Sequence, residues 1–214
     1  MLQNEFGVKA VYPTSEDGPE VAKVIDNENL RRQLEKRGDE IRVVTGHFPL
    51  ATVDLLPGEW RTFTVLREPV ARTLSFLRHQ QKVDPARAEQ TFAEIYSDPV
   101  LFDGLVHNHM VKMLSLEADE MPAAGVLAHR AMDHERLVTA KERLFQIDVV
   151  GLQEEFPAFL SRLNGVFGWT LGPELRTNTT SEVPVDDEFR ARVRADNALD
   201  VELYRFANEA FGIT

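Results

Sequence analysis

Short runs of β-branched and apolar residues alternate along the chain with segments of helical periodicity, and this alternation limits the fold more than any other feature. The runs lie at residues 41–45, 61–66 and 148–152. Segments with apolar residues three and four positions apart lie at residues 29–37, 69–81, 90–96, 100–114, 133–145, 155–167 and 186–211. Residues 1–20 show little periodicity, so we expect an extended segment there. Strands that alternate with helices predict an α/β domain with a mainly parallel sheet flanked by helices.

Length and composition favour one domain over residues 1–214. The chain is 43% hydrophobic, and no linker or low-complexity stretch divides it. It contains no cysteine, which excludes disulfides and thiolate metal ligands. Proteins of reducing compartments commonly lack disulfides, so we expect a cytoplasmic protein. We find neither a secretory leader nor a run of apolar residues long enough for a transmembrane segment.

The net charge limits the partners that the chain can bind. A formal charge of −11 repels nucleic acids and anionic lipids, so we expect no nucleic-acid partner. Salt screens distant surface charges, so a local arginine pocket could still bind a small anionic nucleotide.

The most informative motif is the end of the run at 61–66 and the helix that follows it. Arg67-Glu68-Pro69 leads into this helix, and Ser75 lies on the helix side away from its apolar stripe. A helix start offers unpaired N–H groups, and a guanidinium matches phosphate oxygens in a bidentate way. The motif therefore indicates a phosphate site, although arginine and serine are also common at ordinary surface helix starts.

A histidine follows the run at 41–45 directly after a glycine. His47 could point into a cleft there, since ligands of open α/β sheets bind at strand ends. An imidazole accepts a proton near neutral pH and can serve as a general base. The alternative is a loop histidine that caps a turn.

Together these motifs resemble those of carbohydrate sulfotransferases that use 3′-phosphoadenosine 5′-phosphosulfate (PAPS). That family carries Arg-Asp-Pro, two residues, Arg, two residues and Ser, and here Glu68 replaces the aspartate. The resemblance implies that Arg67 and Ser75 hold the 3′-phosphate of PAPS and that His47 is the catalytic base. It also implies a three-layer, P-loop-like sulfotransferase fold, a glycan as the hydroxyl-bearing acceptor, and no metal.

Three further segments are similar to parts of the same family. They are residues 108–115, residues 148–156, and the polar loop at 176–180 with the helices after it. By this resemblance Arg176, Asn178 and Thr180 contact the 3′-phosphate or the base. The alternative is a polar surface loop. The histidines at positions 107 and 109 suggest a metal site, but side chains two apart on a helix point to different faces, so we expect none.

The family's loop for the 5′-phosphosulfate has no counterpart in this chain. Residues 1–7 resemble the late turn of the helix that should follow that loop, so we expect that the first βα unit is missing. The sequence also lacks the triphosphate cradle that a kinase of related shape would need. The predicted activity is sulfuryl transfer from PAPS to a hydroxyl, and the alternative is a non-catalytic nucleotide- or glycan-binding remnant.

Overall fold

The structure is a computed structural model that describes residues 1–19, 22–121, 127–172 and 185–212. Within these residues, four strands form two separate parallel pairs. β1 (Val11–Tyr12) pairs with β2 (Val43–Val44), and β3 (Phe63–Leu66) pairs with β4 (Val149–Leu152). The predicted α/β character and parallel pairing are confirmed, but the described strands form two half-sheets instead of one sheet.

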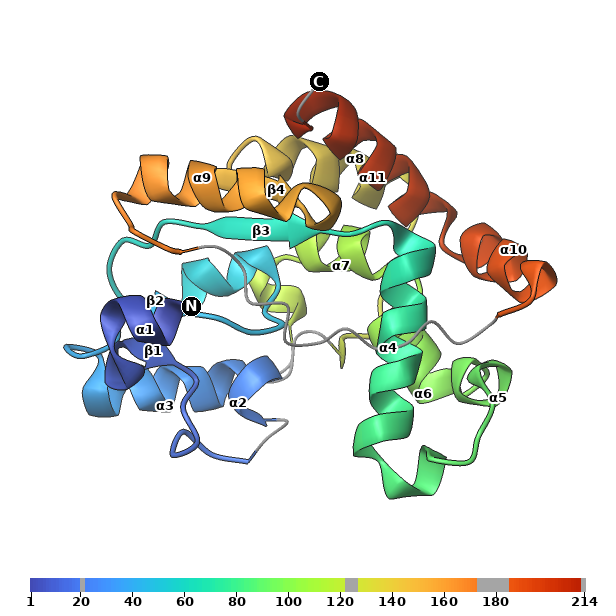
Figure 1. Ribbon diagram of the computed structural model, residues 1–214, viewed down its shortest axis with the longest axis horizontal. Coiled ribbons are helices and arrows are strands. Elements are labelled where there is room, and N and C mark those ends of the chain that lie inside the picture. The colour runs from blue at the N-terminus through green and yellow to red at the C-terminus, as the bar shows by residue number, and fades with distance from the viewer. Residues whose placement is uncertain (20–21, 122–126, 173–184, 213–214) are drawn as a thin grey trace.

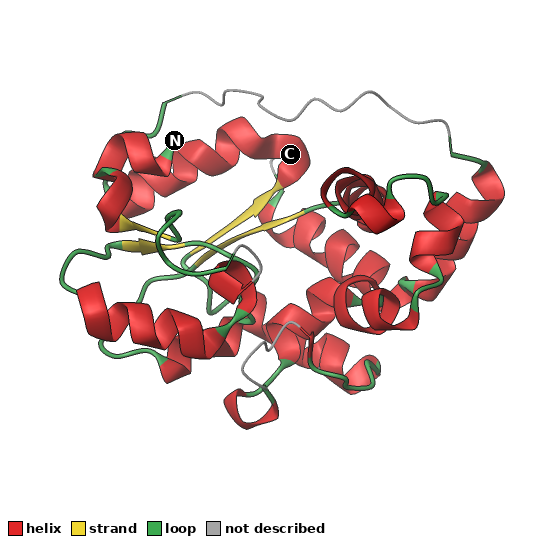
Figure 2. Ribbon diagram, turned by 90° about the horizontal axis from the view of Figure 1, so that it is seen from below, coloured by secondary structure: helices red, strands yellow, loops and turns green. Residues whose placement is uncertain are grey.

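Helices make up most of the described chain and surround the strands (Figure 1). In a view turned by 90°, the strands lie between helices on opposite sides (Figure 2). The α-helices are α1 Leu2–Phe6, α2 Ala22–Ile25, α3 Asn27–Arg37, α4 Pro69–Val83, α5 Phe92–Tyr96, α6 Pro99–Leu101, α7 His109–Ser115, α8 His134–Leu144, α9 Phe156–Phe167, α10 Asp187–Asp196 and α11 Ala198–Phe211. In the described ranges, no helix combines the length and the apolar character that a bilayer crossing requires.

The prediction for residues 1–20 was wrong, because this segment contains α1 and strand β1. β1 has only two residues, and it is a strand because it pairs with β2. Such a short pairing leaves no periodicity in the sequence.

The predicted continuous helices at 100–114 and 186–211 are both interrupted. Phe102–Val106 forms a π-helical turn, and Asn108 then takes a left-handed conformation with φ 44°. The second helix breaks at Asn197, whose side chain accepts a hydrogen bond from the Asn108 backbone N–H at 2.8 Å. The Asn108 side chain in turn accepts from the backbone N–H groups of Leu199 and Asp200. The two breaks therefore stabilise each other across the fold.

Both faces of the β3–β4 pair are covered. Val150 and Leu152 pack into a core cluster with α7, α8 and α11, whereas Val149 packs against α9. Gly151 lies so close to α9 that a Cβ atom there would come within 2.3 Å of the Phe159 ring. Every residue of β4 is buried, which explains its continuous apolar sequence.

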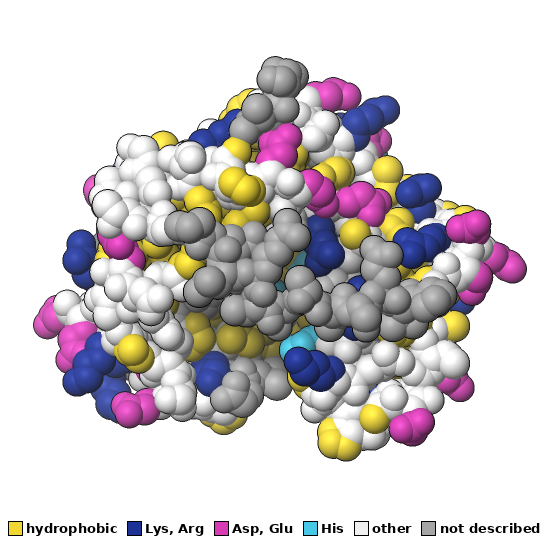
Figure 3. Space-filling view, in the orientation of Figure 1, with side chains coloured by type: hydrophobic (Ala, Val, Ile, Leu, Met, Phe, Trp, Pro, Cys, Tyr) yellow, Lys and Arg dark blue, Asp and Glu magenta, His cyan; other side chains and the backbone are white. Residues whose placement is uncertain are grey.

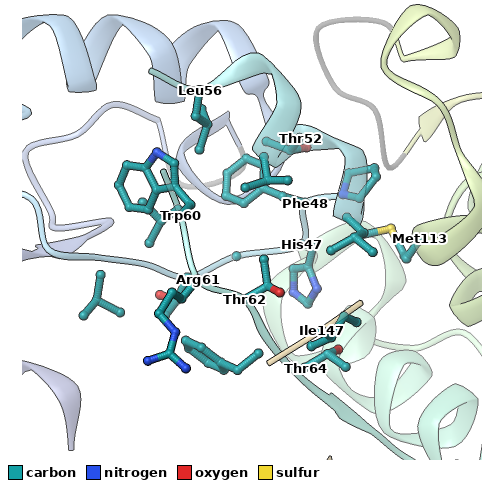
Figure 4. A pocket seen from close by; sticks show the side chains of 18 of the residues that line it. His47, Phe48, Thr52, Leu56, Trp60, Arg61, Thr62, Thr64, Met113 and Ile147 are labelled. Atoms are coloured by element: carbon teal, nitrogen blue, oxygen red, sulfur yellow. The ribbon is translucent and has the colours of Figure 1, made fainter. Parts of the chain in front are cut away.

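A cavity of about 940 Å³ separates the two half-sheets. Residues 41–50 and 56–67 contribute to its lining without a gap. A strand with one face toward a cavity would line it with every second residue only. Here consecutive residues of both strands line the cavity, so β2 and β3 have their edges toward it. Figure 4 shows side chains of both segments, including His47, Trp60 and Thr62, around the cavity.

Candidate active site

Two of the predicted site residues line this cavity. His47 follows β2 and Arg67 follows β3, so each lies just beyond the end of a strand. In Figure 3, histidine side chains lie beside lysine or arginine side chains near the centre of the visible face, next to hydrophobic surface. The structure thus brings the predicted base and one predicted phosphate ligand to the same cavity.

The backbone around His47 is held closely. Its N–H donates to the Val24 carbonyl at 2.7 Å. At Gly46, a Cβ atom would lie 2.4 Å from the Phe48 ring and 2.8 Å from the same Val24 oxygen. A side chain at position 46 would therefore displace the segment that carries His47.

The His47 imidazole is exposed to the cavity, and its surroundings favour the neutral form. Partial enclosure by the protein lowers the pKa of His47, and the charges of Arg72 and His79 lower it further. An imidazole with a lowered pKa is unprotonated at neutral pH, as a general base must be.

Arg67 reaches the cavity from the turn between β3 and α4. It forms no hydrogen bond or ion pair with another described residue, so its donors are available. Pro69 occupies the first position of α4, and the Glu68 carboxylate accepts from the Ala71 N–H at 2.7 Å. Glu68 therefore serves as the N-cap of α4.

Ser75 lies on α4 and is partly buried, but it is not among the residues that line the cavity. The expected packing of the helix is confirmed, because Val70, Leu74 and Leu77 are all buried. Arg176, Asn178 and Thr180 lie outside the described residues, and their predicted contacts stay predictions.

The sequence analysis placed residues 108–115 and the helices at 186–211 in segments similar to the sulfotransferases, but it did not predict a cluster of ionisable side chains beside His47. It consists of Arg72 on α4, His109 and Lys112 on α7, and Asp200 on α11. Arg72 and His109 line the cavity. The Arg72 guanidinium donates to the Leu105 carbonyl at 3.1 Å.

The buried members of this cluster have altered proton affinities. Burial lowers the pKa of His109 well below its ordinary value, and the charges of Arg72 and Lys112 add to the effect. Burial also lowers the pKa of Lys112 to about 8 and raises that of Asp200 to about 6. His109 is therefore neutral at pH 7, while Lys112 and Asp200 are mostly charged.

Hydrogen bonds fix Lys112 and Asp200 within the scaffold. The Lys112 ammonium donates to the carbonyls of Asp103 and Gly104 in the π-helical turn. The Asp200 carboxylate accepts from the N–H groups of Met110 at 3.0 Å and Val111 at 2.8 Å. Among the residues that the structure describes, no three His, Cys, Asp or Glu side chains lie close enough to hold a metal ion.

Comparison with known proteins gives one relative. The chain is 28% identical over 182 residues to heparan-sulfate 6-O-sulfotransferase 2 from Gallus gallus, which covers 69% of this chain and 43% of the relative. The chain is similar to a carbohydrate sulfotransferase. It spans less than half the length of that protein. No protein-family model matches the chain.

Proposed function

We propose that this chain carries the acceptor-side base and the 3′-phosphate site of a PAPS-dependent sulfotransferase that acts on a carbohydrate hydroxyl. One observation carries the proposal: His47 and Arg67 follow two different strands and line one cavity. The similarity to a heparan-sulfate sulfotransferase supports it.

The proposed reaction needs a proton acceptor and a binding site for the leaving nucleotide. His47 takes the proton of the acceptor hydroxyl as its oxygen forms a bond to sulfur. The bond between sulfur and the 5′-phosphate oxygen breaks, and adenosine 3′,5′-bisphosphate leaves with that electron pair. Arg67 holds its 3′-phosphate from the cavity wall, and Ser75, on α4 outside the residues that line the cavity, is the second predicted ligand. A positioned base typically contributes about 10²- to 10⁴-fold in rate.

The proposal includes the prediction of a missing strand, phosphate loop and helix start. With strands about 4.8 Å apart, layers about 10 Å apart and a rise of about 3.3 Å, one strand residue fills roughly 160 Å³. A cavity of about 940 Å³ is large enough for a short strand along the edges of β2 and β3. One added strand between β2 and β3 would join the half-sheets into the predicted three-layer fold.

Titration calorimetry with adenosine 3′,5′-bisphosphate tests the site. We expect binding to the wild type, roughly 10-fold or more weaker binding to Arg67→Ala because a charge-assisted phosphate contact is lost, and a smaller loss for Ser75→Ala. Arg42→Ala is the matched control, since Arg42 lines the same cavity from the start of β2. Equal affinities for wild type and Arg67→Ala, or no binding at all, would remove the basis of the proposal.

The alternative is a catalytically impaired or non-catalytic nucleotide- or glycan-binding remnant, and the similarity to only 43% of the relative supports this alternative. Binding of the bisphosphate without transfer of radiolabelled sulfate from PAPS to a heparan-type glycan would support this alternative. Preference for ATP over the bisphosphate would instead indicate a kinase.

A further inference from the structure

The guanidinium of Arg72 lies on the cavity wall without a carboxylate in contact. It forms no ion pair within 4.0 Å in the described part of the chain, and its only hydrogen bond to a described residue goes to Leu105. That bond uses one of five N–H donors. No other hydrogen bond to a described residue uses the remaining Arg72 donors, and Arg72 lines the cavity.

Asp200 does not neutralise Arg72 by contact. Each of its oxygens accepts a backbone N–H at the start of α7, and its charge acts on Arg72 only through space. The other groups around Arg72 are bases: His47, His109 and Lys112. At pH 7 His47 and His109 are neutral, so the positive charges at this point are those of Arg72 and Lys112, and neither forms an ion pair with a described carboxylate.

Such an arrangement is costly unless an anion binds. Partly buried charges in proteins are usually paired, because removal from water is not otherwise compensated. A purely structural arginine that ties α4 to the π-helical turn would not need to keep its remaining donors open to a cavity. A guanidinium presents a fork of donors that matches the oxygens of sulfate or phosphate.

We propose that Arg72 and His47 form an oxyanion subsite that binds a sulfate-like group. This subsite is separate from the proposed 3′-phosphate site of Arg67 and Ser75. Its role rests on the proposed function: there it would hold the sulfonate group as it passes to the acceptor oxygen. The binding of a free sulfate ion does not depend on that function.

The subsite predicts a link between anion binding and the proton on His47. The groups that act on His47 are Arg72 and His79 from α4 and, beside them, His109 from α7, and all are cationic or neutral. An anion bound there favours the imidazolium, so sulfate should raise the pKa of His47. By linkage, sulfate should bind more tightly as the pH falls through that pKa.

NMR titration of the histidine ring signals of the full chain tests this link. Sodium sulfate is the probe, sodium chloride at equal ionic strength is its control, and His47→Gln and His79→Gln assign the two neighbouring signals. We expect the His47 pKa to rise with sulfate but not with chloride. No difference between the two salts in the wild type would overturn the proposal.

Variants then locate the subsite. We expect Arg72→Met to weaken sulfate binding roughly 10-fold or more and Arg72→Lys to retain part of it, while Arg67→Ala keeps the full His47 response. The assignment of the subsite to Arg72 would be refuted if folded Arg72→Met kept the full sulfate-induced shift of the His47 pKa. It would also be refuted if only Arg67→Ala lost that shift. Should Arg72→Met not fold, the wild-type and Arg72→Lys titrations still decide. If adenosine 3′,5′-bisphosphate does not bind but sulfate still shifts the His47 pKa through Arg72, the nucleotide site alone is refuted.

Discussion

Asp200 contributes a carboxylate to the cluster of Arg72, His109 and Lys112, and it is fully buried where α7 begins. Burial raises its pKa from 3.8 to about 6, even though two backbone N–H groups and two nearby cations favour its charged form. Its neutral form is therefore the more stable one in the folded protein at mildly acidic pH.

Asp200→Asn should change how stability depends on pH. Between about pH 4 and pH 6 the folded wild type holds a proton that the unfolded chain has released, so the Asp200 contribution to stability falls as the pH rises. Asparagine does not titrate. The unfolding free energy of Asp200→Asn minus that of the wild type should therefore rise by on the order of 3 kcal/mol from below pH 4 to above pH 6.

Urea denaturation at a series of pH values measures this difference, in which the titrating groups that do not interact with Asp200 cancel. A difference that stays constant from pH 4 to pH 7 would show that the Asp200 pKa is the same in both states.

Single residues were predictable where they follow strands. His47 and Arg67 could be placed at one cavity because each directly follows a β-branched run. The role of Asp200 could not be predicted, because it contacts Met110 from 90 residues away along the chain. That contact requires the helix break at Asn197, which has no signal in the local periodicity.

The unit of β3 and α4 was the most predictable element. Its apolar run, Pro69 and the spacing of Val70, Leu74 and Leu77 indicated a strand, a turn and a helix, and the structure confirms all three. The start of α4 depends on the Glu68 side chain, which satisfies the Ala71 N–H.

Replacement of this cap should weaken α4. Glu68→Ala leaves the Ala71 N–H without its partner and should lower the unfolding free energy by about 1 kcal/mol. Glu68→Asp is the matched control, since aspartate is a strong N-cap, and it should stay close to wild type. Thermal denaturation of the three proteins measures the effect, and an equal loss in both variants would show that the carboxylate does not cap α4.

The contact between β4 and α9 gives a second prediction at this scale. Gly151→Ala would place a methyl group 2.3 Å from the Phe159 ring, and such overpacking costs about 1–3 kcal/mol. Chemical denaturation should show this loss, and Gly165→Ala on α9, where nothing lies within 4 Å of the added carbon, should not show it. A wild-type value for Gly151→Ala would mean that α9 can move away from β4.

At the scale of the whole molecule, the fold consists of two half-sheets whose edges meet at one cavity. The Thr62 carbonyl accepts from the Val149 N–H at 3.2 Å and so points to β4. In a trans peptide the C=O and the following N–H point in opposite directions, so the Phe63 N–H points away from β4. Because directions alternate along a strand, the Val65 N–H also points away from β4.

Amide hydrogen exchange should therefore alternate along β3. We expect the amides of Phe63 and Val65 to exchange at least about 10-fold faster than those of Thr64 and Leu66, which face β4. Two-dimensional NMR after transfer to D₂O resolves the four signals. Uniform protection would show that the free edge of β3 is already covered.

The same geometry bears on how copies of this protein behave toward one another in solution. A strand edge on an outer surface can pair with the edge of another molecule and so begin aggregation. Here the free edges of β2 and β3 line the cavity between the two half-sheets, and the strong negative charge keeps copies apart. The protein should therefore stay monodisperse at concentrations where an outward-facing edge would form fibrils.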